Sequence, residues 1–305
     1  MPVSAIRVRR LCTELSGVAR TSELAELGVD AYSLRLAVDA GEVVRLREGV
    51  YGVADLPAEV QTAVRHGGRL GCLSRLGIDG VWLLEQPASV HVAMMRTGRR
   101  RFHSECRCIT HWSDSRLAGP AVALDEALVQ VLGCRGEEEF FVALESAMRK
   151  RLITRSGIER IRSRVPKVHR GLVGFARWDA DSGLESLLRL RLRAHGLALA
   201  SQIDIPGIGR VDFVLGDRLI LEVDGKQNHV DGFDSLIGTE HARAAAASKR
   251  HKDLVRDAVA AAYGFETLRF DYALVVHDWP LVEAAILAKV DRGLHLRSRV
   301  AGRGR

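Results

Sequence analysis

The stretch GRVDFVLGDRLILEVDGK, residues 209–226, decides the fold of the C-terminal part of this chain. Apolar residues occupy alternate positions before residue 216, and residues 219–223 are almost continuously apolar. This pattern is typical of two short strands joined by a tight turn, here at Gly216 and Asp217. We therefore predict a β-hairpin.

Three carboxylates interrupt the apolar runs of this hairpin: Asp212 near the start of the first strand, and Glu222 and Asp224 near the end of the second. An unpaired charge buried there would be destabilising by several kcal/mol or would shift its pKa. Because side chains in a strand alternate between faces, Glu222 and Asp224 share one face. Converging carboxylates favour Mg²⁺ or Mn²⁺. The alternative is a solvated hairpin rim whose acids point outward.

The spacing Asp-x9-Glu-x-Asp resembles the PD-(D/E)xK nuclease core. Residues 209–212 and 221–225 also resemble a bacterial family of unknown-function proteins grouped with very-short-patch-repair endonucleases. The resemblance extends over about residues 182–290, because a helix capped by Ser182 precedes the hairpin and a second helix and a strand follow it. It implies that Glu185, at the start of the first helix, belongs to the metal-binding acids.

One position departs from the nuclease pattern, since Asp224 stands where a lysine is usual. This argues against a lysine-assisted mechanism more than against catalysis. Lys226 and His229 lie just beyond and could supply the missing cation or base. A histidine beside Asn228 is equally consistent with a turn residue or a phosphate contact.

The helix expected over about residues 242–262 carries Lys252 and Arg256 four residues apart, and likewise Asp253 and Asp257. Residues at this spacing share a helix face. The resemblance implies that Arg256 points toward the scissile phosphate and that Asp253 or Asp257 braces it. The alternative is a solvated helix with neighbouring opposite charges.

Residues 1–56 are expected to form three short helices and a β-wing. Residues 18–28 offer a Thr or Ser cap and a Gly stop, Asp30 can cap the next helix, and residues 43–53 read as a hairpin turning at residues 48–49.

This N-terminal segment resembles the winged helix of AbiEi-type antitoxins, including its Gly-Val-Tyr ending at residues 49–51. The resemblance implies a helix in a DNA major groove, with Tyr32, Ser33 and Arg35 near bases and with Arg45 and Arg47 near phosphates. The alternative is a winged helix used only for packing.

Residues 57–180 are predicted to be an α/β connector, with a strand over residues 88–94 and helices over residues 123–132 and 138–152. The basic run at residues 97–101 could contact phosphates or form a solvated turn.

The connector also contains His103, Cys106, Cys108 and His111, whose nitrogen and sulfur ligands suit zinc. Two arguments oppose a zinc site. A strand would place both cysteines on one face with their neighbours turned away, and Cys-x-Cys is not the spacing of a zinc ribbon. Zinc remains the less favoured alternative.

The composition limits the classes of protein to which the chain can belong. The 305 residues are 47% hydrophobic, enough for two or three domains, and the formal charge of +7 favours a polyanionic partner. No apolar run is long enough to cross a membrane and residues 1–7 lack a signal-peptide core, so we expect a cytoplasmic protein. Five cysteines then indicate reduced thiols.

The sequence thus predicts a mixed α/β (α+β) chain with a winged helix (1–56), a connector (57–180) and a restriction-endonuclease-like core (181–305) whose basic tail, residues 292–305, frays. The predicted activity is that of a Mg²⁺- or Mn²⁺-dependent endodeoxyribonuclease with DNA as partner and a homodimer as a further possibility. Its predicted metal ligands are Glu185, Asp212, Glu222 and Asp224, joined in catalysis by Lys226, His229 and Arg256. The alternative is an antitoxin-type DNA-binding regulator with an inactive nuclease core.

Overall fold

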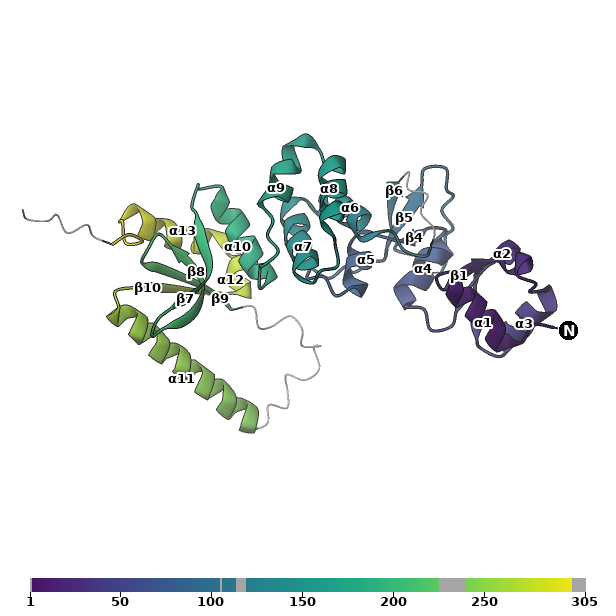
Figure 1. Ribbon diagram of the computed structural model, residues 1–305, viewed down its shortest axis with the longest axis horizontal. Coiled ribbons are helices and arrows are strands. Elements are labelled where there is room, and N and C mark those ends of the chain that lie inside the picture. The colour runs from purple at the N-terminus through teal and green to yellow at the C-terminus, as the bar shows by residue number, and fades with distance from the viewer. Residues whose placement is uncertain (1, 105, 114–118, 225–239, 298–305) are drawn as a thin grey trace, which may run out of the picture. The chain divides into compact units, whose positions relative to one another are not determined.

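The computed structural model describes residues 2–104, 106–113, 119–224 and 240–297, and of residues 240–250 only the helical backbone. The chain divides into two compact units, residues 1–178 and 179–305, each described by itself below. Both mix helices with small sheets, which confirms the predicted fold class (Figure 1). The division falls two residues before the predicted boundary at residue 180, and no division falls at residue 56.

The first unit begins with a winged helix. Its elements are α1 (Ala5–Glu14), β1 (Val18–Arg20), α2 (Thr21–Glu26), α3 (Ala31–Asp39), β2 (Val43–Arg47) and β3 (Val50–Val53). The strands form an antiparallel sheet in the order β1-β3-β2. The Asp30 carboxylate caps α3 by accepting from the Ser33 amide at 2.7 Å, as predicted. The predicted Thr or Ser cap of α2 is wrong, because Thr21 already lies inside the helix and Arg20 is the N-cap.

The wing packs onto the element that follows it. Leu46 of β2 and Val50 of β3 form a buried cluster with Val64 of α4. The apolar core therefore continues past residue 56, which explains why the winged helix and the connector form one unit.

The connector contains a second sheet and a set of helices. Its elements are α4 (Ala58–His66), β4 (Arg69–Leu70), α5 (Cys72–Ile78), β5 (His91–Met95), β6 (Ile109–Ser113), α6 (Leu124–Arg135), α7 (Glu137–Arg149), α8 (Arg155–Arg164), η1 (Lys167–His169) and α9 (Arg170–Phe175). The sheet order is β4-β5-β6, with β5 and β6 parallel. The predicted strand and both predicted helices are present as β5, α6 and α7.

The second unit is built on a four-stranded sheet. Its elements are α10 (Gly183–Arg193), β7 (Leu199–Ile205), β8 (Gly209–Leu215), β9 (Leu219–Asp224), α11 (Glu240–Ala262), β10 (Glu266–Asp271), α12 (Tyr272–His277) and α13 (Trp279–Asp291). The sheet order is β10-β9-β8-β7, antiparallel except for β10, which runs parallel to β9. The predicted hairpin is β8 and β9, and Ser182 caps α10 as expected. Strand β7 was not predicted.

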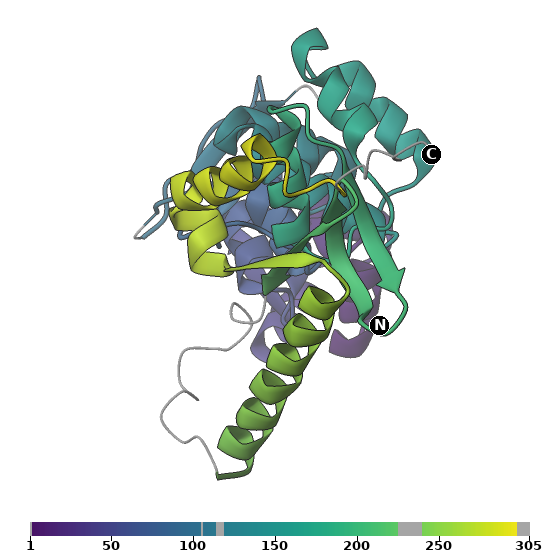
Figure 2. The same ribbon diagram turned by 90° about the vertical axis from the view of Figure 1, so that its left-hand side faces the viewer.

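The C-terminal end of α11 covers one face of this sheet (Figure 2). Val214 of β8 and Ile220 of β9 pack there with Ala260 of α11. Asp212 and Glu222 lie two residues away along the same strands and therefore share this face. The hairpin acids thus face α11.

The start of the C-terminal tail does not fray as predicted. The His295 carbonyl accepts from the amides of Asp217 and Arg218 at 3.0 and 3.2 Å, and the Arg297 amide donates to the Asp217 carboxylate at 2.6 Å. These bonds tie the segment after α13 to the β8–β9 turn. Residues 298–305 lie outside the described part of the chain.

A candidate active site on the C-terminal sheet

Four polar residues lie side by side across the second unit's sheet. Arg269 of β10 is in register with Glu222 of β9. The β8–β9 register, continued one pair beyond its last bonded pair, places Asp212 opposite Glu222. The β7–β8 register likewise places Gln202 opposite Asp212. Because neighbouring strands are about 5 Å apart, this row brings two acids, an amide and a guanidinium within reach of one another.

The Asp212 side chain is turned toward β9. Its Oδ2 accepts a hydrogen bond from the Val223 amide at 2.9 Å. The Asp212 carboxylate thus replaces the backbone carbonyl that would accept from this amide in a regular ladder, and the backbone pairing of β8 with β9 ends beside Glu222. This bond fixes Asp212 next to the Glu222 carboxyl.

Glu185 reaches the row from the first turn of α10. Gln202 Nε2 donates to Glu185 Oε2 at 2.7 Å, and Arg210 Nε donates to Gln202 Oε1 at 2.7 Å. Since a guanidinium can only donate, the Arg210 contact orients the amide with its NH₂ group toward Glu185. Gln202 has a φ of +54°, a region that residues other than glycine rarely adopt. The local structure therefore holds Gln202 in this position.

Two arginines complete the site. Arg256 of α11 donates through Nη2 to Glu222 Oε1 at 2.6 Å and also to the Arg210 carbonyl. Arg269 donates to both carboxylate oxygens of Asp257, the closest contact being 2.8 Å. The prediction that Asp257 braces Arg256 is therefore wrong, because Asp257 pairs with Arg269.

Burial and like charge perturb the two glutamates. Glu185 is 7% exposed and Glu222 is 8% exposed. Burial raises the pKa of Glu185 to about 7, and the nearby Asp212 charge acts in the same direction. Burial, followed by the Asp212 charge, also raises the pKa of Glu222 to about 7, although Arg256 opposes the shift. Two buried carboxyls beside a third acid leave the site short of positive charge.

A set of carboxylate oxygens of this kind fits a hard divalent cation. In the described part of the chain, however, the oxygens of Glu185, Asp212 and Glu222 are not all within 4.8 Å of one another. Gln202 holds the first of these carboxylates and Arg256 holds the last. Binding one ion through all three acids would require their side chains to move closer together.

The other predicted residues lie at or beyond the end of β9. Asp224 is exposed, shares the face of Glu222 and is in register with Asp271 of β10. Lys226 and His229 fall outside the described residues, so their predicted roles stay predictions.

Three residues of this site were not among the predicted site residues: Gln202, Arg210 and Arg269. A polar residue inside a predicted strand was the available signal for the two arginines, but Gln202 lies on the strand that was not predicted.

The winged helix presents part of its predicted DNA-contacting set. Tyr32, 56% exposed, and Arg35 lie on the outer face of α3, and Arg45 is exposed on β2. Ser33 is 0% exposed, and its Oγ accepts from the Val3 amide at 2.8 Å. The prediction that Ser33 contacts a base is therefore wrong, because its side chain is buried and already bonded.

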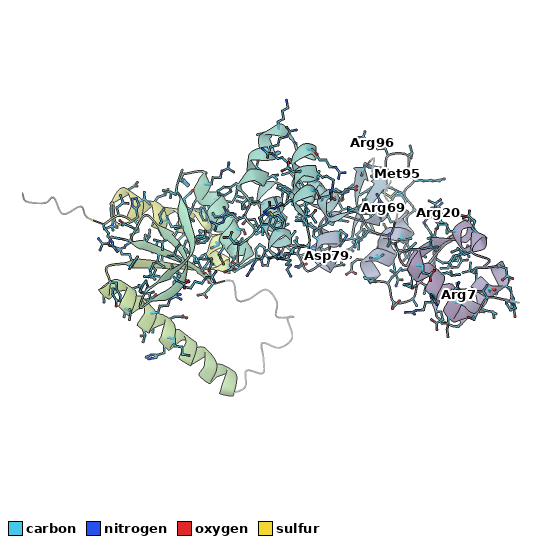
Figure 3. The ribbon with its side chains drawn as sticks, viewed as in Figure 1. Arg7, Arg20, Arg69, Asp79, Met95 and Arg96 are labelled. Carbon is cyan, nitrogen blue, oxygen red and sulfur yellow. The ribbon has the colours of Figure 1, made fainter. Side chains whose placement is uncertain are left out.

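Arg47 lies in an arginine-lined cavity instead of on the open wing. It donates to the Val64 carbonyl at 3.1 Å, and burial, together with the charges of Arg101 and Arg20, lowers its pKa. The cavity has a volume of about 430 Å³, and Arg20, Arg47 and Arg69 are among its lining residues (Arg20 and Arg69 are labelled in Figure 3). A phosphate contact by Arg47 would have to occur inside this cavity.

Comparisons with known proteins bear on the N-terminal segment. Residues 6–54, from α1 to the end of β3, match the family model described as "Transcriptional regulator, AbiEi antitoxin". No match was found among the curated proteins. The N-terminal domain is therefore similar to antitoxin-type transcriptional regulators, and this similarity suggests DNA binding.

A search of the described helices finds none with the length and apolar character needed to span a membrane. The predicted cytoplasmic location and homodimer stay predictions.

Proposed function

We propose that the chain is a metal-dependent DNA endonuclease whose second unit hydrolyses phosphodiester bonds in DNA engaged by the N-terminal winged helix. The observation that carries the proposal is the cluster of Glu185, Asp212 and Glu222, two of them buried, on the face of the sheet that α11 covers. The order of helix, three antiparallel strands, helix and parallel strand supports a PD-(D/E)xK type of core.

The acids would hold Mg²⁺ or Mn²⁺, with Asp224 at the rim of the site. A bound ion would supply Lewis acidity and lower the pKa of a water molecule for attack on phosphorus. Asp212 would keep its orientation through the Val223 amide, and Gln202 would hold Glu185.

Arg256 has the geometry for contacting a phosphate. Its planar guanidinium can hold two oxygens through parallel hydrogen bonds, a geometry that lysine cannot reproduce. In the structure this group pairs with Glu222. A cation held by that acid would leave the arginine available to a phosphodiester oxygen.

A second candidate function is an antitoxin-type DNA-binding regulator with an inactive core. It is favoured by the match of residues 6–54 and by the Arg256–Glu222 pair, which satisfies one acid without a metal. Asp224 at the usual lysine position points the same way.

Cleavage assays distinguish the two functions. Purified protein is incubated with labelled duplex, nicked, mismatched and single-stranded DNA in Mg²⁺, Mn²⁺ or EDTA. The proposal expects metal-dependent cleavage of at least one substrate by the parent and by Asp204→Asn, an exposed acid on β7 that serves as control, but not by Glu222→Gln.

Binding without cleavage of any substrate would favour the regulator. If Glu222→Gln cleaves DNA as fast as the parent, the activity comes from another part of the chain or from a contaminant.

A further inference from the structure

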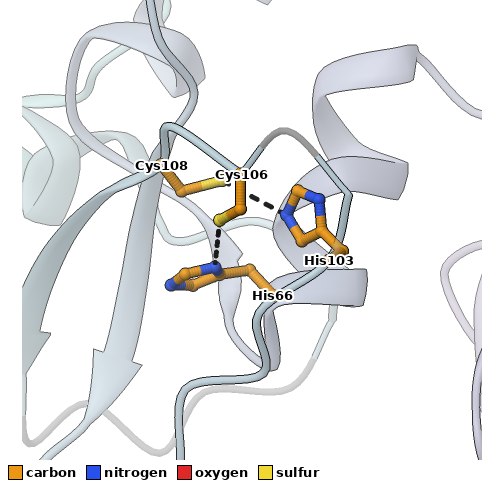
Figure 4. Close-up of side chains that lie close together, drawn as sticks. All are labelled: His66, His103, Cys106 and Cys108. Carbon is orange, nitrogen blue, oxygen red and sulfur yellow. Dashed lines mark hydrogen bonds between the residues drawn. The ribbon is translucent and has the colours of Figure 1, made fainter.

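Four potential metal ligands meet beside the connector sheet. His66 is the last residue of α4 and is 2% exposed, while His103, Cys106 and Cys108 come from the loop between β5 and β6 (Figure 4). One ligand atom from each residue lies within 4.8 Å of all the others. The Arg101 amide donates to the His66 carbonyl at 2.8 Å and holds the loop against α4.

Two separations in this group are close to those of a tetrahedral zinc site. With Zn–N bonds of about 2.0 Å and Zn–S bonds of about 2.3 Å, ligand atoms in a tetrahedron are roughly 3.3 to 3.8 Å apart. Cys106 Sγ is 3.2 Å from His66 Nδ1, and Cys108 Sγ is 3.6 Å from His103 Nε2.

The other ring nitrogens are oriented as metal-binding histidines require. His66 Nε2 lies 3.3 Å from Thr110 Oγ1, and His103 Nδ1 lies 3.3 Å from the Ser104 carbonyl. A donor bond from one ring nitrogen fixes the tautomer and directs the lone pair of the other nitrogen at the metal. In both rings the nitrogen left for a metal is the one that faces a cysteine sulfur.

A second group of the same composition involves α5, β5, β6 and α6. It consists of Cys72, His91, His111 and Cys134, whose ligand atoms also lie within 4.8 Å of one another. His91 Nδ1 is 2.9 Å from His111 Nε2 and 3.9 Å from Cys134 Sγ. The contact between the two imidazoles is slightly shorter than a tetrahedral edge, so a metal would separate them by a few tenths of an ångström.

One ligand of this second group has a strained backbone conformation. Cys72 has a φ of +47°, which residues other than glycine rarely adopt. Its amide donates to Gln130 Oε1 at 2.8 Å, which keeps the residue at the start of α5. Both Cys72 and His91 are 0% exposed, so this is an interior site supplied by four different elements.

Strand alternation explains why there are two groups. Cys108 and Thr110 face α4, whereas His111 faces the opposite side of the sheet, toward His91. The sequence pattern His103-x2-Cys106-x-Cys108-x2-His111 therefore does not form one ligand set. It gives three ligands to one group and His111 to the other.

We propose that the connector binds two structural zinc ions, one on each face of the β4–β5–β6 sheet, each held by two cysteines and two histidines. Four protein ligands close the coordination sphere, which is typical of structural and not of catalytic zinc. A Rieske-type cluster would divide the cysteines and histidines between two irons, whereas here histidine nitrogens face cysteine sulfurs in both groups and the four ligand atoms of each group lie within 4.8 Å of one another.

The loop between β5 and β6 shows what the first ion would stabilise. The described residues of this loop, 96–104 and 106–108, have no regular secondary structure, and its Phe102 is 81% exposed. A zinc ion would cross-link the loop to α4 in place of an apolar core.

The decisive measurement is the metal content of the full-length protein, freed of any affinity tag and purified in a non-chelating reductant. Native mass spectrometry and elemental analysis should give two zinc ions per chain. Zinc K-edge absorption should show on average two sulfur and two nitrogen ligands per ion. Titration of the folded parent with an organomercurial should release both ions as four thiols react. Less than half a zinc per chain, or all-oxygen coordination, would overturn the proposal.

Single variants separate the two sites. Cys106→Ser and Cys134→Ser should each retain one zinc and the double variant none. Cys12→Ala, at the cysteine that belongs to neither group, should retain two. If the parent holds one zinc ion and only one of the two serine variants loses it, the site of that variant is supported and the other site is refuted. Because the parent measurements do not depend on the variants, a variant that fails to fold leaves the proposal testable.

Discussion

In the first unit each of four buried acids accepts a hydrogen bond from another segment, whereas in the second unit two buried acids lie beside a third. Asp125, Glu126, Glu139 and Glu145 lie on α6 or α7 and are at most 6% exposed. Their partners are respectively the Arg160 guanidinium, the Ser113 hydroxyl and the amides of Leu84 and Arg177, at 2.5 to 2.8 Å. These acids fasten loops and helices to α6 and α7.

Glu185 and Glu222 also have partners, but each additionally faces the Asp212 charge. Such crowding destabilises the metal-free fold and is relieved only by a proton or a cation. Burial of an acid therefore does not by itself indicate a site. Two buried acids that share one like-charged neighbour are a better indication, since Asp212 raises the pKa of both Glu185 and Glu222, whereas the like charge of Glu85 is the smallest cause of the shift of Glu139.

The largest expected effect comes from Asp212→Asn. If the proposed function holds, we expect it to slow cleavage at least about 1000-fold, roughly 4 kcal/mol of transition-state stabilisation, because it removes a charge that would bind the proposed metal ion. In EDTA the melting temperature should stay equal or rise, because the amide oxygen can still accept from the Val223 amide while the like charge is gone. Single-turnover kinetics and thermal melts measure both. A clear loss of stability would make Asp212 a structural acid like those of the first unit.

The matched change in the first unit is Asp125→Asn. Asp125 is 4% exposed and accepts from Arg160 at 2.5 Å. Loss of this charge-assisted bond should lower the free energy of unfolding by about 1 to 3 kcal/mol, while the cleavage rate per folded molecule stays unchanged. Urea denaturation measures the first quantity. If stability is unaffected and activity falls, the contrast between the two units is wrong.

Much of the fold on which this contrast depends could be predicted from the sequence. The hairpin at residues 209–224, the Ser182 cap and the helices α6 and α7 follow from local patterns of apolar residues and caps, which do not depend on distant contacts. Strand β7 could not be predicted, because its apolar alternation is weak and its pairing with β8 supplies the missing stabilisation.

The candidate sites were only partly predictable, because some of their residues are brought together only by contacts between distant parts of the chain. Asp212 and Glu222 were found because they interrupt apolar runs. Gln202 depends on the register of β7 with β8, and His66 comes from a helix far along the chain from Cys106. Ser33 was misassigned because the sequence does not show which side of a short helix is buried.

A smaller effect is expected for Arg256→Lys. Lysine can keep the ion pair with Glu222 but cannot reproduce the planar guanidinium, which also donates to the Arg210 carbonyl. Cleavage should fall at least about tenfold, or ~1.4 kcal/mol, with little change in melting temperature. Arg292→Lys, at an exposed arginine after α13, is the control and should behave like the parent. Equal rates for all three proteins would assign Arg256 to the scaffold.

DNA binding by the first unit should be separable from chemistry in the second. Arg35 and Arg45 are exposed on α3 and β2. If each contacts a phosphate, the variant carrying both Arg35→Gln and Arg45→Gln should reduce the slope of log K against log salt by about 2. Arg7→Gln on α1 is the control. Fluorescence anisotropy at several salt concentrations measures the slope. An unchanged slope would make the winged helix a packing module.

The smallest expected effect is the pH dependence of stability without metal. Glu185 has a pKa of about 7 in the folded protein, raised from 4.5, so the folded state binds its proton more tightly than the unfolded state does. Its contribution to stability is therefore fully present below about pH 4.5 and is lost as the pH rises through 7. Glu185→Gln removes this loss, because the amide is always neutral and its oxygen can still accept from Gln202. In EDTA the variant should melt a few degrees above the parent at pH 8, and the difference should shrink toward pH 5.

Glu139→Gln tests the first unit in the same way. Burial also raises the Glu139 pKa, so the difference in melting temperature between this variant and the parent should have the same sign. It should be smaller, because the amides of Leu84 and Glu85 and the Arg135 charge oppose the shift of Glu139, and the like charge of Glu85 is the smallest of its causes. A larger difference for Glu139→Gln than for Glu185→Gln would show that burial, and not the Asp212 charge, distinguishes the acids of the two units.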